Sequence, residues 1–575
     1  MHEPASPTTS KLQYFNRDQG WIQVHERPCP FHSQTFLDTM QEMVLNPNYN
    51  TSWILRADIL LDSRSDDISE ELSCCSLLKE EERTYVLAPE FEMRGFVRSR
   101  TVVRRFIPRN PQRDKATNQT CLFFEERVED RVLGNLKTLV VYIAHAASTE
   151  ELPYYLPAVK GVAFLYEETP GPIEELESIQ KISIHYLLFT PSTIESPGMT
   201  TRLERTALRL MDRIIKVGNG SIRGYEKKVH HDLVVPRERS QDTYLKLRVR
   251  HAKRLMDSWV EKTDPKKHVF EDILIAAFLI ELWEDMYRSG KGEFPGFVDI
   301  GCGNGVLVDI LLREGYKGYG FDARRRMTWK IFERETQECL SEKVLIPWVL
   351  GDEMIKAAAL AEAEAEGIKQ LRIAAEENLQ LEGGIMAGIH DGRFQEGTFI
   401  ISNHADELTG WTPLLAKASN SPFLIIPCCS HDLSGDKHRH KSTVIKTRAV
   451  ENVDKLGTRI GTISSEYASL VEWTATIAQD VGYVVEREVM RIPSTRNIGL
   501  IGRKCGDGEM SVGEVLEREG GGVGWADKAF ALRRMQLQKG HGTASKARSP
   551  LCIEIMKKAH QKMKAEGLGL CKIVE

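Results

Sequence analysis

The chain lacks the features of a membrane or secreted protein. It has no run of about 18 apolar residues, the length that a membrane-spanning helix needs, and its polar first residues contain no apolar core of the signal-peptide type. The 11 cysteines show none of the paired spacing that is typical of a disulfide framework. These absences predict a reduced, soluble, intracellular protein.

The net charge of -5 conceals a strong segregation of charge along the 575 residues. Residues 94–115 hold eight basic residues and one acid, and residues 528–572 hold eleven basic residues and two acids. Residues 352–382 instead hold eight acids and three bases. Such clustering is typical of a protein that binds a phosphate backbone with part of its surface, although each basic run alone could be a solvated face.

The length predicts two or three domains. We interpret residues 1–235 as a mixed α/β region without a cofactor motif, which could be a substrate-binding or scaffold domain. Its strand-like runs are 53–61, 101–107, 122–124, 139–143, 162–166 and 182–189. An amphipathic helix is expected at 202–217, with the glycine-rich residues 218–220 as its stop. The apolar face of this helix should comprise Leu203, Leu208, Met211 and Ile215.

Residues 236–505 are predicted to form an open, mostly parallel sheet with helices on both faces, because strand and helix patterns alternate from Phe297 onward. Two helices should precede the sheet. The first, at 244–261, is rich in bases that could spread a positive surface over it. The second begins at Asp264-Pro265, where the acid caps the helix and the proline starts its first turn. The basic, weakly patterned residues 506–575 are expected to form a disordered or partly helical tail.

The stretch 297–305 (FVDIGCGNG) carries the strongest indication of function. An apolar strand leads into a turn with Gly301, Gly303 and Gly305, and such a turn lets the backbone pass close to a nucleoside cofactor. Val306 stands where the dinucleotide fingerprint has a further glycine that lets the helix approach the pyrophosphate. S-adenosylmethionine has no pyrophosphate and is therefore favoured as the ligand. A glycine-rich turn without a ligand is the alternative.

Three acidic residues accompany this turn. Asp322 closes the next predicted strand, 318–321, and could accept hydrogen bonds from both ribose hydroxyls. Asp299 lies in the strand that leads into the turn, and we expect it to help seat the cofactor. Asp352 follows a strand-like run at 346–350, at a place where such folds often contact adenine.

Polar side chains follow the apolar strand predicted to start at Phe399. Because ligands of open sheets bind beyond the carboxyl ends of the strands, Asn403, His404 and Asp406 should face the methyl donor. These three side chains can orient a hydroxyl group or take its proton. Alternatively, Asp406 caps a helix and His404 is a satisfied packing residue.

A second apolar strand, 423–427, ends in Cys428, Cys429 and His431. These side chains, with two further histidines nearby, could suggest zinc, but adjacent cysteines lack the usual Cys-x2-4-Cys spacing. We therefore expect a strand end that shapes the pocket and no metal. The two further histidines are His438 and His440.

A third polar segment lies at 490–502. Its Arg491 and Arg496 offer donors for a phosphate or a bound nucleotide. A plain hairpin loop explains the segment about as well.

Together, these motifs resemble those of the eukaryotic tRNA (uracil-2'-O)-methyltransferase family, whose members methylate the ribose of the uridine at position 44, beside the variable arm of serine tRNA. The resemblance covers roughly residues 236–504. It rests on 264–272 (DPKKHVFED), 298–305 (VDIGCGNG), 320–329 (GFDARRRMTW), 403–411 (NHADELTGW), 427–429 (PCC) and 491–497 (RIPSTRN). Met327 and Gly410 depart from the expected lysine and proline, at positions that the chemistry does not require.

The resemblance implies a Rossmann-like methyltransferase domain that uses S-adenosylmethionine and acts on serine tRNA in the cytoplasm, with an N-terminal region that could bind tRNA. We expect no membrane or DNA partner, and the sequence leaves protein partners open. The alternatives are a methyltransferase for another RNA, a protein or a small molecule, and a non-catalytic RNA-binding adaptor with the same fold.

The reaction then suggests roles for the residues singled out above. Asn403, His404 or Asp406 would guide or deprotonate the 2'-hydroxyl, since positioning supplies much of the barrier reduction for a weak nucleophile. The predicted cofactor-binding residues are Asp299, Gly301, Gly303, Gly305, Asp322 and Asp352. The predicted phosphate contacts are Arg324, Arg325, Arg326, Arg491 and Arg496.

Overall fold

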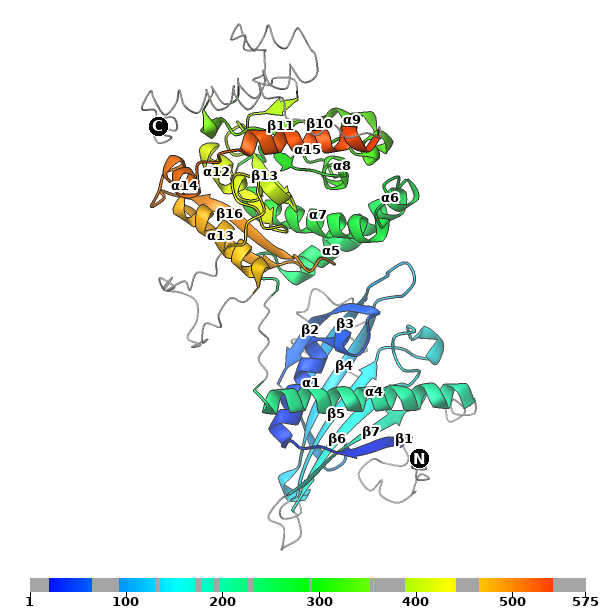
Figure 1. Cartoon of the computed structure of the whole chain (residues 1–575). Coiled ribbons are helices and arrows are strands. Elements are labelled where there is room, and N and C mark those ends of the chain that lie inside the picture. Colours follow the sequence, from blue (N-terminus) through cyan, green and yellow to red (C-terminus); the bar gives the residue numbers. More distant parts are fainter. Residues whose placement is uncertain are drawn as a thin grey trace. The chain divides into compact units, whose positions relative to one another are not determined.

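The computed structural model describes residues 20–64, 93–130, 135–170, 178–189, 197–224, 231–288, 292–351, 355, 388–440 and 465–540. The chain forms two compact units, an N-terminal unit (Met1–Lys228) and a C-terminal unit (Val229–Glu575), both drawn in Figure 1. We had placed this boundary after residue 235. It lies earlier because the Glu488 carboxylate accepts hydrogen bonds from the backbone N–H groups of residues 232–234 (2.7, 2.7 and 3.0 Å), which fixes that segment to the C-terminal unit.

The N-terminal unit is built on a seven-stranded antiparallel sheet with the order β1-β7-β6-β5-β4-β3-β2. All six strand-like runs expected from the sequence are strands. The unit also contains β1 and α1, which the sequence did not predict. The strands are β1 (Trp21–Pro28), β2 (Ile54–Ser63), β3 (Phe96–Pro108), β4 (Thr117–Glu126), β5 (Leu136–Ala144), β6 (Gly161–Thr169) and β7 (Ile179–Leu187). The principal helices are α1 (Ser33–Leu45) and α4 (Pro197–Ile222).

Helices α1 and α4 pack on one face of this sheet, where their apolar residues join a single buried cluster with strand residues (Figure 1). The buried face of α4 consists of Leu203, Ala207, Met211 and Ile214. The expected face was partly wrong, because Leu208 is 39% exposed. The expected stop at 218–220 was also wrong, since α4 continues to Ile222. Gly218 suits this position because a Cβ there would lie 2.5 Å from the Phe31 ring.

The C-terminal unit contains a second seven-stranded sheet with the order β10-β9-β8-β13-β14-β16-β15. Its first five strands in this order run parallel, and β16 runs antiparallel to both of its neighbours. These strands are β8 (Phe297–Ile300), β9 (Gly318–Asp322), β10 (Leu340–Glu342), β13 (Phe399–Asn403), β14 (Phe423–Ile426), β15 (Tyr483–Val489) and β16 (Ile498–Cys505). A separate pair comprises β11 (Val344–Leu345) and β12 (Ile389–His390).

Helices cover both faces of this sheet, as the alternating pattern predicted. One core cluster contains residues of α7 and α8, and the other contains residues of α12 to α15. The helices are α5 (Arg237–Leu247), α6 (Lys253–Asp257), α7 (Pro265–Tyr287), α8 (Val306–Arg313), α9 (Arg334–Glu338), α12 (Trp411–Ala418), α13 (Glu466–Asp480), α14 (Val512–Arg518) and α15 (Trp525–Gly540). None of the described helices combines the length and the apolar character that crossing a bilayer requires.

The structure confirms the expected start of α7, where the Asp264 side chain accepts a hydrogen bond from the backbone N–H of Lys266 at 3.0 Å. The helix expected at 244–261 is instead broken, because α5 ends at Leu247, a π-helical turn covers Arg248–Ala252, and α6 ends at Asp257. The run 346–350 is not a strand, and Trp348–Leu350 form a 3-10 turn. Pro347 explains this difference, since its nitrogen cannot donate to a strand ladder.

The basic run at 94–115 is only partly an open surface. Arg100 donates to both carboxylate oxygens of Asp62 (2.7 and 2.6 Å), and Arg104 is buried. The acidic run at 352–382 and residues 541–575 of the basic tail lie outside the described residues, apart from Ile355. The basic composition of residues 94–115 therefore predicted a larger exposed positive surface than the structure shows.

Residues 506–540 do not form a separate tail. Trp525 and Phe530 of α15 are 1% and 2% exposed and belong to a core cluster of the C-terminal unit. The Trp525 indole N–H donates to the backbone oxygen of Leu345 at 2.8 Å. These residues are partly helical, as expected, but the prediction of a separate tail was wrong for them, because their short apolar stripe is flanked by glycines that weaken its helical pattern.

The buried His390 on β12 makes the C-terminal unit sensitive to acid. Its ring stacks on Phe321 at 4.4 Å, and its Nδ1 accepts the Gly392 N–H at 2.9 Å. Burial lowers the pKa of His390 from 6.5 to about 4. The unfolded chain therefore binds a proton that the folded chain excludes, so stability is lost as pH falls from about 6.5 towards 4, by up to roughly 1.4 kcal/mol per pH unit. Hydrogen exchange of β9 and β12 should accelerate between pH 7 and pH 5 beyond its intrinsic pH dependence.

The matched variant for this prediction is His390→Gln, which removes the titrating ring. Its exchange rates, corrected for the intrinsic rates, should depend less on pH than those of the unmodified chain. An equal pH dependence in both proteins would contradict the assignment of the effect to His390.

Candidate active site

The glycine turn connects β8 to α8 at the carboxyl edge of the C-terminal sheet. Gly301 and Gly303 have φ angles of +72° and +53°, which favour glycine. A Cβ on Gly301 would lie 3.2 Å from the Ala405 Cβ, whereas a Cβ on Gly303 would meet nothing within 4 Å. Gly303 thus borders open space, where a ligand could approach the backbone.

Asp322, at the end of β9, holds this turn in place. Its two carboxylate oxygens accept the backbone N–H groups of Gly303 (3.1 Å) and Arg324 (2.9 Å). Carboxylate oxygens have further lone pairs for hydroxyl donors. The position agrees with the role predicted for Asp322.

Gly305 plays a different part in the turn. It is the N-cap of α8 at φ +75°, and a Cβ there would lie 2.9 Å from Leu340 and 3.2 Å from Phe332 and Trp329. Gly305 does not line the adjacent cavity. Because Gly305 has no side chain, α8 can pack against these three residues. The structure gives no support to the predicted direct contact between Gly305 and a cofactor.

A cavity of about 540 Å³ opens in front of the glycine turn. Helix α15 borders it through Trp525, Ala529 and Leu532, which the sequence reasoning had assigned to a tail. Asp352, which was expected to contact adenine, lies outside the described residues. The predicted site residues that line the cavity are Asp299, Gly301, Gly303, Asp322, Arg324, Arg326, Asn403, His404, Asp406 and Arg496.

Asn403, His404 and Asp406 line this cavity from the end of β13. His404 and Asp406 have φ angles of +51° and +44°, a conformation that L side chains rarely adopt. Such strain clusters at functional sites, where the surrounding structure holds it in place. Among the described residues, the buried atoms Asn403 Oδ1 and His404 Nδ1 have no hydrogen-bond partner. Polar atoms without partners at a cavity wall are suited to contacts with a bound molecule.

Two acids of α7 belong to the same site, although the sequence reasoning gave them no role. Asn403 donates to Asp272 at 3.3 Å, and the ring of His404 lies 3.4 Å from Glu271. Both acids line the cavity. They end the DPKKHVFED motif and stand on a helix that is otherwise largely buried and apolar, which is the signal that could have revealed them.

Two buried carboxyl groups of the cavity, those of Asp272 and Asp299, favour their protonated forms. Burial, followed by the neighbouring Glu271, raises the pKa of Asp272 to about 8. Burial, followed by Asp272 and Asp322, raises the pKa of Asp299 well above its usual value. The Asp299 Oδ1 atom is buried and finds no hydrogen-bond partner in the part of the chain that the structure describes. A cationic ligand would relieve this accumulation of buried acids.

Cys428 contacts the candidate base directly, because its thiol donates to Asp406 Oδ1 at 2.9 Å. Burial and the Asp406 charge raise the pKa of Cys428, which keeps the thiol protonated. Asp406, Cys428 and Cys429 have ligand atoms within 4.8 Å of one another. Structural zinc sites usually have four protein ligands, whereas this group of described residues offers three.

Two of the three histidines that follow the cysteines, His431 and His440, point elsewhere, and the third, His438, is not part of the group either. The His431 ring lies 3.9 Å from Glu407, and the His440 ring stacks on Trp473 at 4.0 Å. Neither ring belongs to the group formed by Asp406 and the two cysteines. The zinc alternative therefore gains no histidine ligand among the described residues.

The five predicted phosphate contacts separate into two sets. Arg324, Arg326 and Arg496 line the cavity, and Arg496 also stacks on the Tyr467 ring at 4.6 Å. Arg325 is exposed and does not line it. Arg491 donates to both oxygens of Asp232 (2.9 and 2.6 Å) and thereby anchors the segment that enters the unit. The structure gives no support to a phosphate contact at Arg491.

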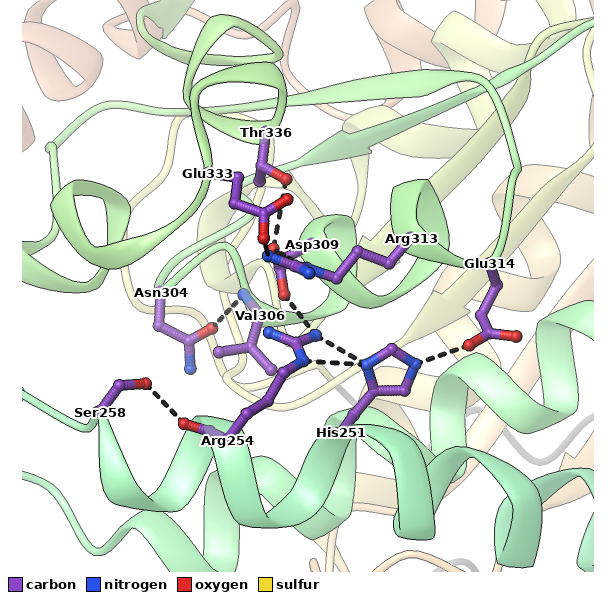
Figure 2. A network of polar contacts seen from close by, with 10 residues as sticks. All are labelled: His251, Arg254, Ser258, Asn304, Val306, Asp309, Arg313, Glu314, Glu333 and Thr336. Atoms are coloured by element: carbon purple, nitrogen blue, oxygen red, sulfur yellow. Dashed lines mark hydrogen bonds and ion pairs between the residues drawn. The ribbon is translucent and has the colours of Figure 1, made fainter.

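A polar network fixes α8 behind the glycine turn, as Figure 2 shows. Asp309 of α8 is fully buried and pairs with Arg254 (2.7 Å) and Arg313 (3.1 Å). Glu314 pairs with His251 (2.6 Å) and Arg250 (2.5 Å). Arg250 and Arg254 were expected to spread a positive surface over their helix. Both arginines hold α8 by these ion pairs, while the Arg250 side chain is 60% exposed and still contributes to a positive surface.

Comparisons with known proteins match this architecture. A family model described as "TRM44-like, N-terminal bet v1-like domain" matches residues 2–228, and one described as "Predicted AdoMet-dependent methyltransferase" matches residues 234–347. The chain is 41% identical over 540 residues to the tRNA (uracil-O(2)-)-methyltransferase of Neurospora crassa, covering 92% of this chain and 96% of that protein. The chain belongs to the tRNA (uracil-O(2)-)-methyltransferase family.

Other members of the family are similar along most of their length. The Schizosaccharomyces pombe protein of the same name is 39% identical over 494 residues, covering 84% of this chain and 85% of that protein. The Yarrowia lipolytica protein is 35% identical, covering 89% and 95%. No solved structure matches the chain. The family resemblance expected from the motifs is confirmed, as are the methyltransferase class and S-adenosylmethionine as its cofactor.

The cavity of this family member fits S-adenosylmethionine on its own chemistry. The open space over Gly303 admits a ligand against the backbone, and the unpartnered Asp299 Oδ1 could accept a hydrogen bond from the ligand's amino group. Buried acids also suit its two positive charges, on the amino group and the sulfonium. Asp299, Gly301, Gly303 and Asp322 are therefore the residues that would hold it.

Asp322→Ala is expected to raise the Kd for S-adenosylmethionine roughly 10- to 100-fold, because charge-assisted hydrogen bonds to the ribose hydroxyls are each worth about 1.5–3 kcal/mol. Isothermal titration calorimetry would measure this change. Glu338→Ala is the control, since this exposed carboxylate pairs with Arg334 on the same helix and does not line the cavity. An unchanged Kd for Asp322→Ala would remove Asp322 from the cofactor site.

Proposed function

We propose that this family member transfers a methyl group from S-adenosylmethionine to the ribose 2'-oxygen of the uridine at position 44, beside the variable arm of serine tRNA. The relatives' name supports a tRNA substrate and methylation of an oxygen. The motif resemblance supports the finer choice of tRNA and nucleotide. We further propose that the reaction takes place in the cytoplasm.

One observation carries the proposal for the site: Asn403, His404 and Asp406 line the same cavity as Gly301, Gly303 and Asp322. The strand order, which reverses between β8 and β13, supports assigning the unit to the Rossmann-like class. Ligands of such sheets bind at the carboxyl edge where the order reverses. A donor and an acceptor bound there would lie within reach of the same polar side chains.

The residues of β13 are well suited to prepare a hydroxyl group. S-adenosylmethionine, when bound, supplies a methyl group that is already activated by its sulfonium. The chain's task is therefore to hold the 2'-hydroxyl in line and to receive its proton. The Asn403 amide and the His404 ring can orient the hydroxyl, and the Asp406 carboxylate can accept its proton. The protonated Cys428 donates to Asp406 and holds that carboxylate in place.

The arginines at the cavity give this site a means to bind the RNA backbone. Arg324, Arg326 and Arg496 border the carboxylates and lie where phosphates beside the target ribose would arrive. Guanidinium groups hold phosphate through paired, charge-assisted hydrogen bonds. The site therefore contains charges of both signs. Its acids suit the cofactor, and its arginines suit the RNA.

The direct test is methyl transfer from labelled S-adenosylmethionine to unmodified serine tRNA, with the product nucleotide mapped by mass spectrometry after nuclease digestion. A serine tRNA with position 44 changed to another nucleotide is the matched control. We expect one 2'-O-methyluridine beside the variable arm and no product with the control tRNA. Transfer to another RNA, a protein or a small molecule, or no transfer despite cofactor binding, would overturn the proposal.

A further inference from the structure

The N-terminal unit contains a second cavity, of about 850 Å³, that has no part in the candidate active site. It lies between α4, strands β3 to β6, and the loops around residues 47–54 and 154–157. We call it the α4 groove. Its volume is within the range of sites that hold small molecules or single nucleotides. Its lining contains more basic and aromatic side chains than that of an ordinary apolar pocket.

A row of basic side chains on α4 borders this groove. The intervals between these residues are three or four, so that they share one face of the helix. Arg202 and Arg213 are half-buried, and Arg205 and Arg209 are exposed. The row consists of Arg202, Arg205, Arg209, Arg213 and Lys216. The acid that lines the groove, Asp212, is paired with Arg27 at 2.6 Å.

The floor of the groove holds a buried cation. Arg104 is 3% exposed and donates to Gln119 Oε1 (3.1 and 2.7 Å) and to the backbone oxygens of Met43 (3.0 Å) and Val44 (2.6 Å). All of these acceptors are neutral, and within the described residues no carboxylate pairs with this guanidinium. Burying a cation without a counter-charge is costly. The guanidinium also lies 4.7 and 4.9 Å from the ring centres of Phe106 and Tyr142, and its charge adds to that of the α4 row in favouring an anionic ligand.

Aromatic rings at the rim lie next to guanidinium groups. The Tyr154 ring is 59% exposed, lies 5.7 Å from the Trp53 ring, and has the Arg202 guanidinium 4.3 Å above its centre. Arg113 lies 4.5 Å from the centre of Trp53. Aromatic rings beside cationic side chains suit single-stranded nucleic acid. Its nucleobases stack on the rings, and its phosphates contact the arginine and lysine side chains.

We propose that the α4 groove binds a single-stranded segment of the RNA substrate, with its phosphates on the α4 arginines and an unstacked base on Tyr154 and Trp53. The inference rests on the proposed RNA substrate of this methyltransferase and assigns the N-terminal unit a separate part in holding it. Sequence-specific or loop-specific RNA binding commonly uses unpaired bases in this way.

The test measures binding of the full chain to a short oligouridylate and to unmodified serine tRNA, without cofactor, by fluorescence anisotropy at several salt concentrations. The double variant Arg205→Ala, Arg209→Ala should raise both Kd values at least about tenfold and lower the slope of log Kd against log salt by about 2. Tyr154→Ala should raise both Kd values roughly 5- to 100-fold with an unchanged slope, since it removes stacking and no charge. The Kd for S-adenosylmethionine should stay the same.

The matched control is Arg223→Ala, which removes an exposed arginine just beyond the end of α4 and outside the groove. It should leave both RNA affinities nearly unchanged. Unchanged affinities in the double variant or in Tyr154→Ala would overturn the proposal, because the groove would then bind no phosphate or no base. Binding is measured without methyl transfer, so a chain that binds RNA in the groove but fails to methylate serine tRNA would contradict the proposed function alone.

Discussion

Asp406→Asn is expected to lower kcat for methylation about 100- to 10,000-fold, the usual contribution of a positioned acid or base. The variant keeps the shape of the side chain and an oxygen that can accept the Cys428 thiol hydrogen, but it loses the carboxylate that takes a proton. Single-turnover kinetics with saturating cofactor and tRNA would measure the change. The Kd for S-adenosylmethionine should remain nearly unchanged, because the glycine turn and Asp322 are intact.

Asp436→Asn is the matched control for this variant. Its carboxylate is 78% exposed and lies on a neighbouring loop, so its loss should leave kcat unaltered. Full turnover by Asp406→Asn would exclude Asp406 as the base. The same assay on His404→Asn and Asp272→Asn would then test two other titratable groups of the cavity as the base.

Asp309→Ala is expected to lower the free energy of unfolding of the C-terminal unit by about 3 kcal/mol, near the lower end for breaking a buried ion pair. The buried carboxylate neutralises two arginines, Arg254 and Arg313, whose side chains are 29% and 28% exposed (Figure 2). Solvent reaches both cations and limits the loss. Urea unfolding followed by hydrogen exchange of α7 and α8 would measure it.

Thr336→Val provides a graded control for the same network. It removes one hydrogen bond of 3.2 Å to Asp309 and leaves both ion pairs, so the expected loss is about 1 kcal/mol. Asp309→Ala should also weaken cofactor binding, because α8 begins directly after the glycine turn. Equal losses in the two variants would mean that the arginines contribute little to the stability of α8.

Local patterns explain why much of the fold could be predicted. Strands β3 to β7 carry dense apolar and β-branched residues, and the β8 to α8 connection has glycines at its three left-handed positions. Strand β1 was missed because of its eight residues only Trp21 is buried, which leaves no alternation to detect. Helix α1 was missed despite a usable signal, since Phe36, Met40, Met43 and Val44 recur at helical spacing.

The candidate site was predictable only where one segment contained the chemistry. The NHAD run after β13 lies in one segment, and all three of its predicted catalytic residues line the cavity. The contribution of Glu271 and Asp272 depends on how α7 packs against β13, more than 120 residues later in the chain, a separation that motif spacing does not encode. The same limit explains Arg491, whose partner Asp232 lies 259 residues away.

The position of α15 has a consequence for synthesis of the protein on the ribosome. Trp525 and Leu532 help to line the candidate active-site cavity, whereas the glycine turn is made more than 200 residues earlier. Domains fold largely as units while the chain emerges, beginning at the N-terminus. The N-terminal unit can therefore fold on the nascent chain before the cofactor cavity is closed. A chain that ends before α15 is made would expose Leu345 and the neighbouring apolar wall of the cavity, and chaperones would bind this surface.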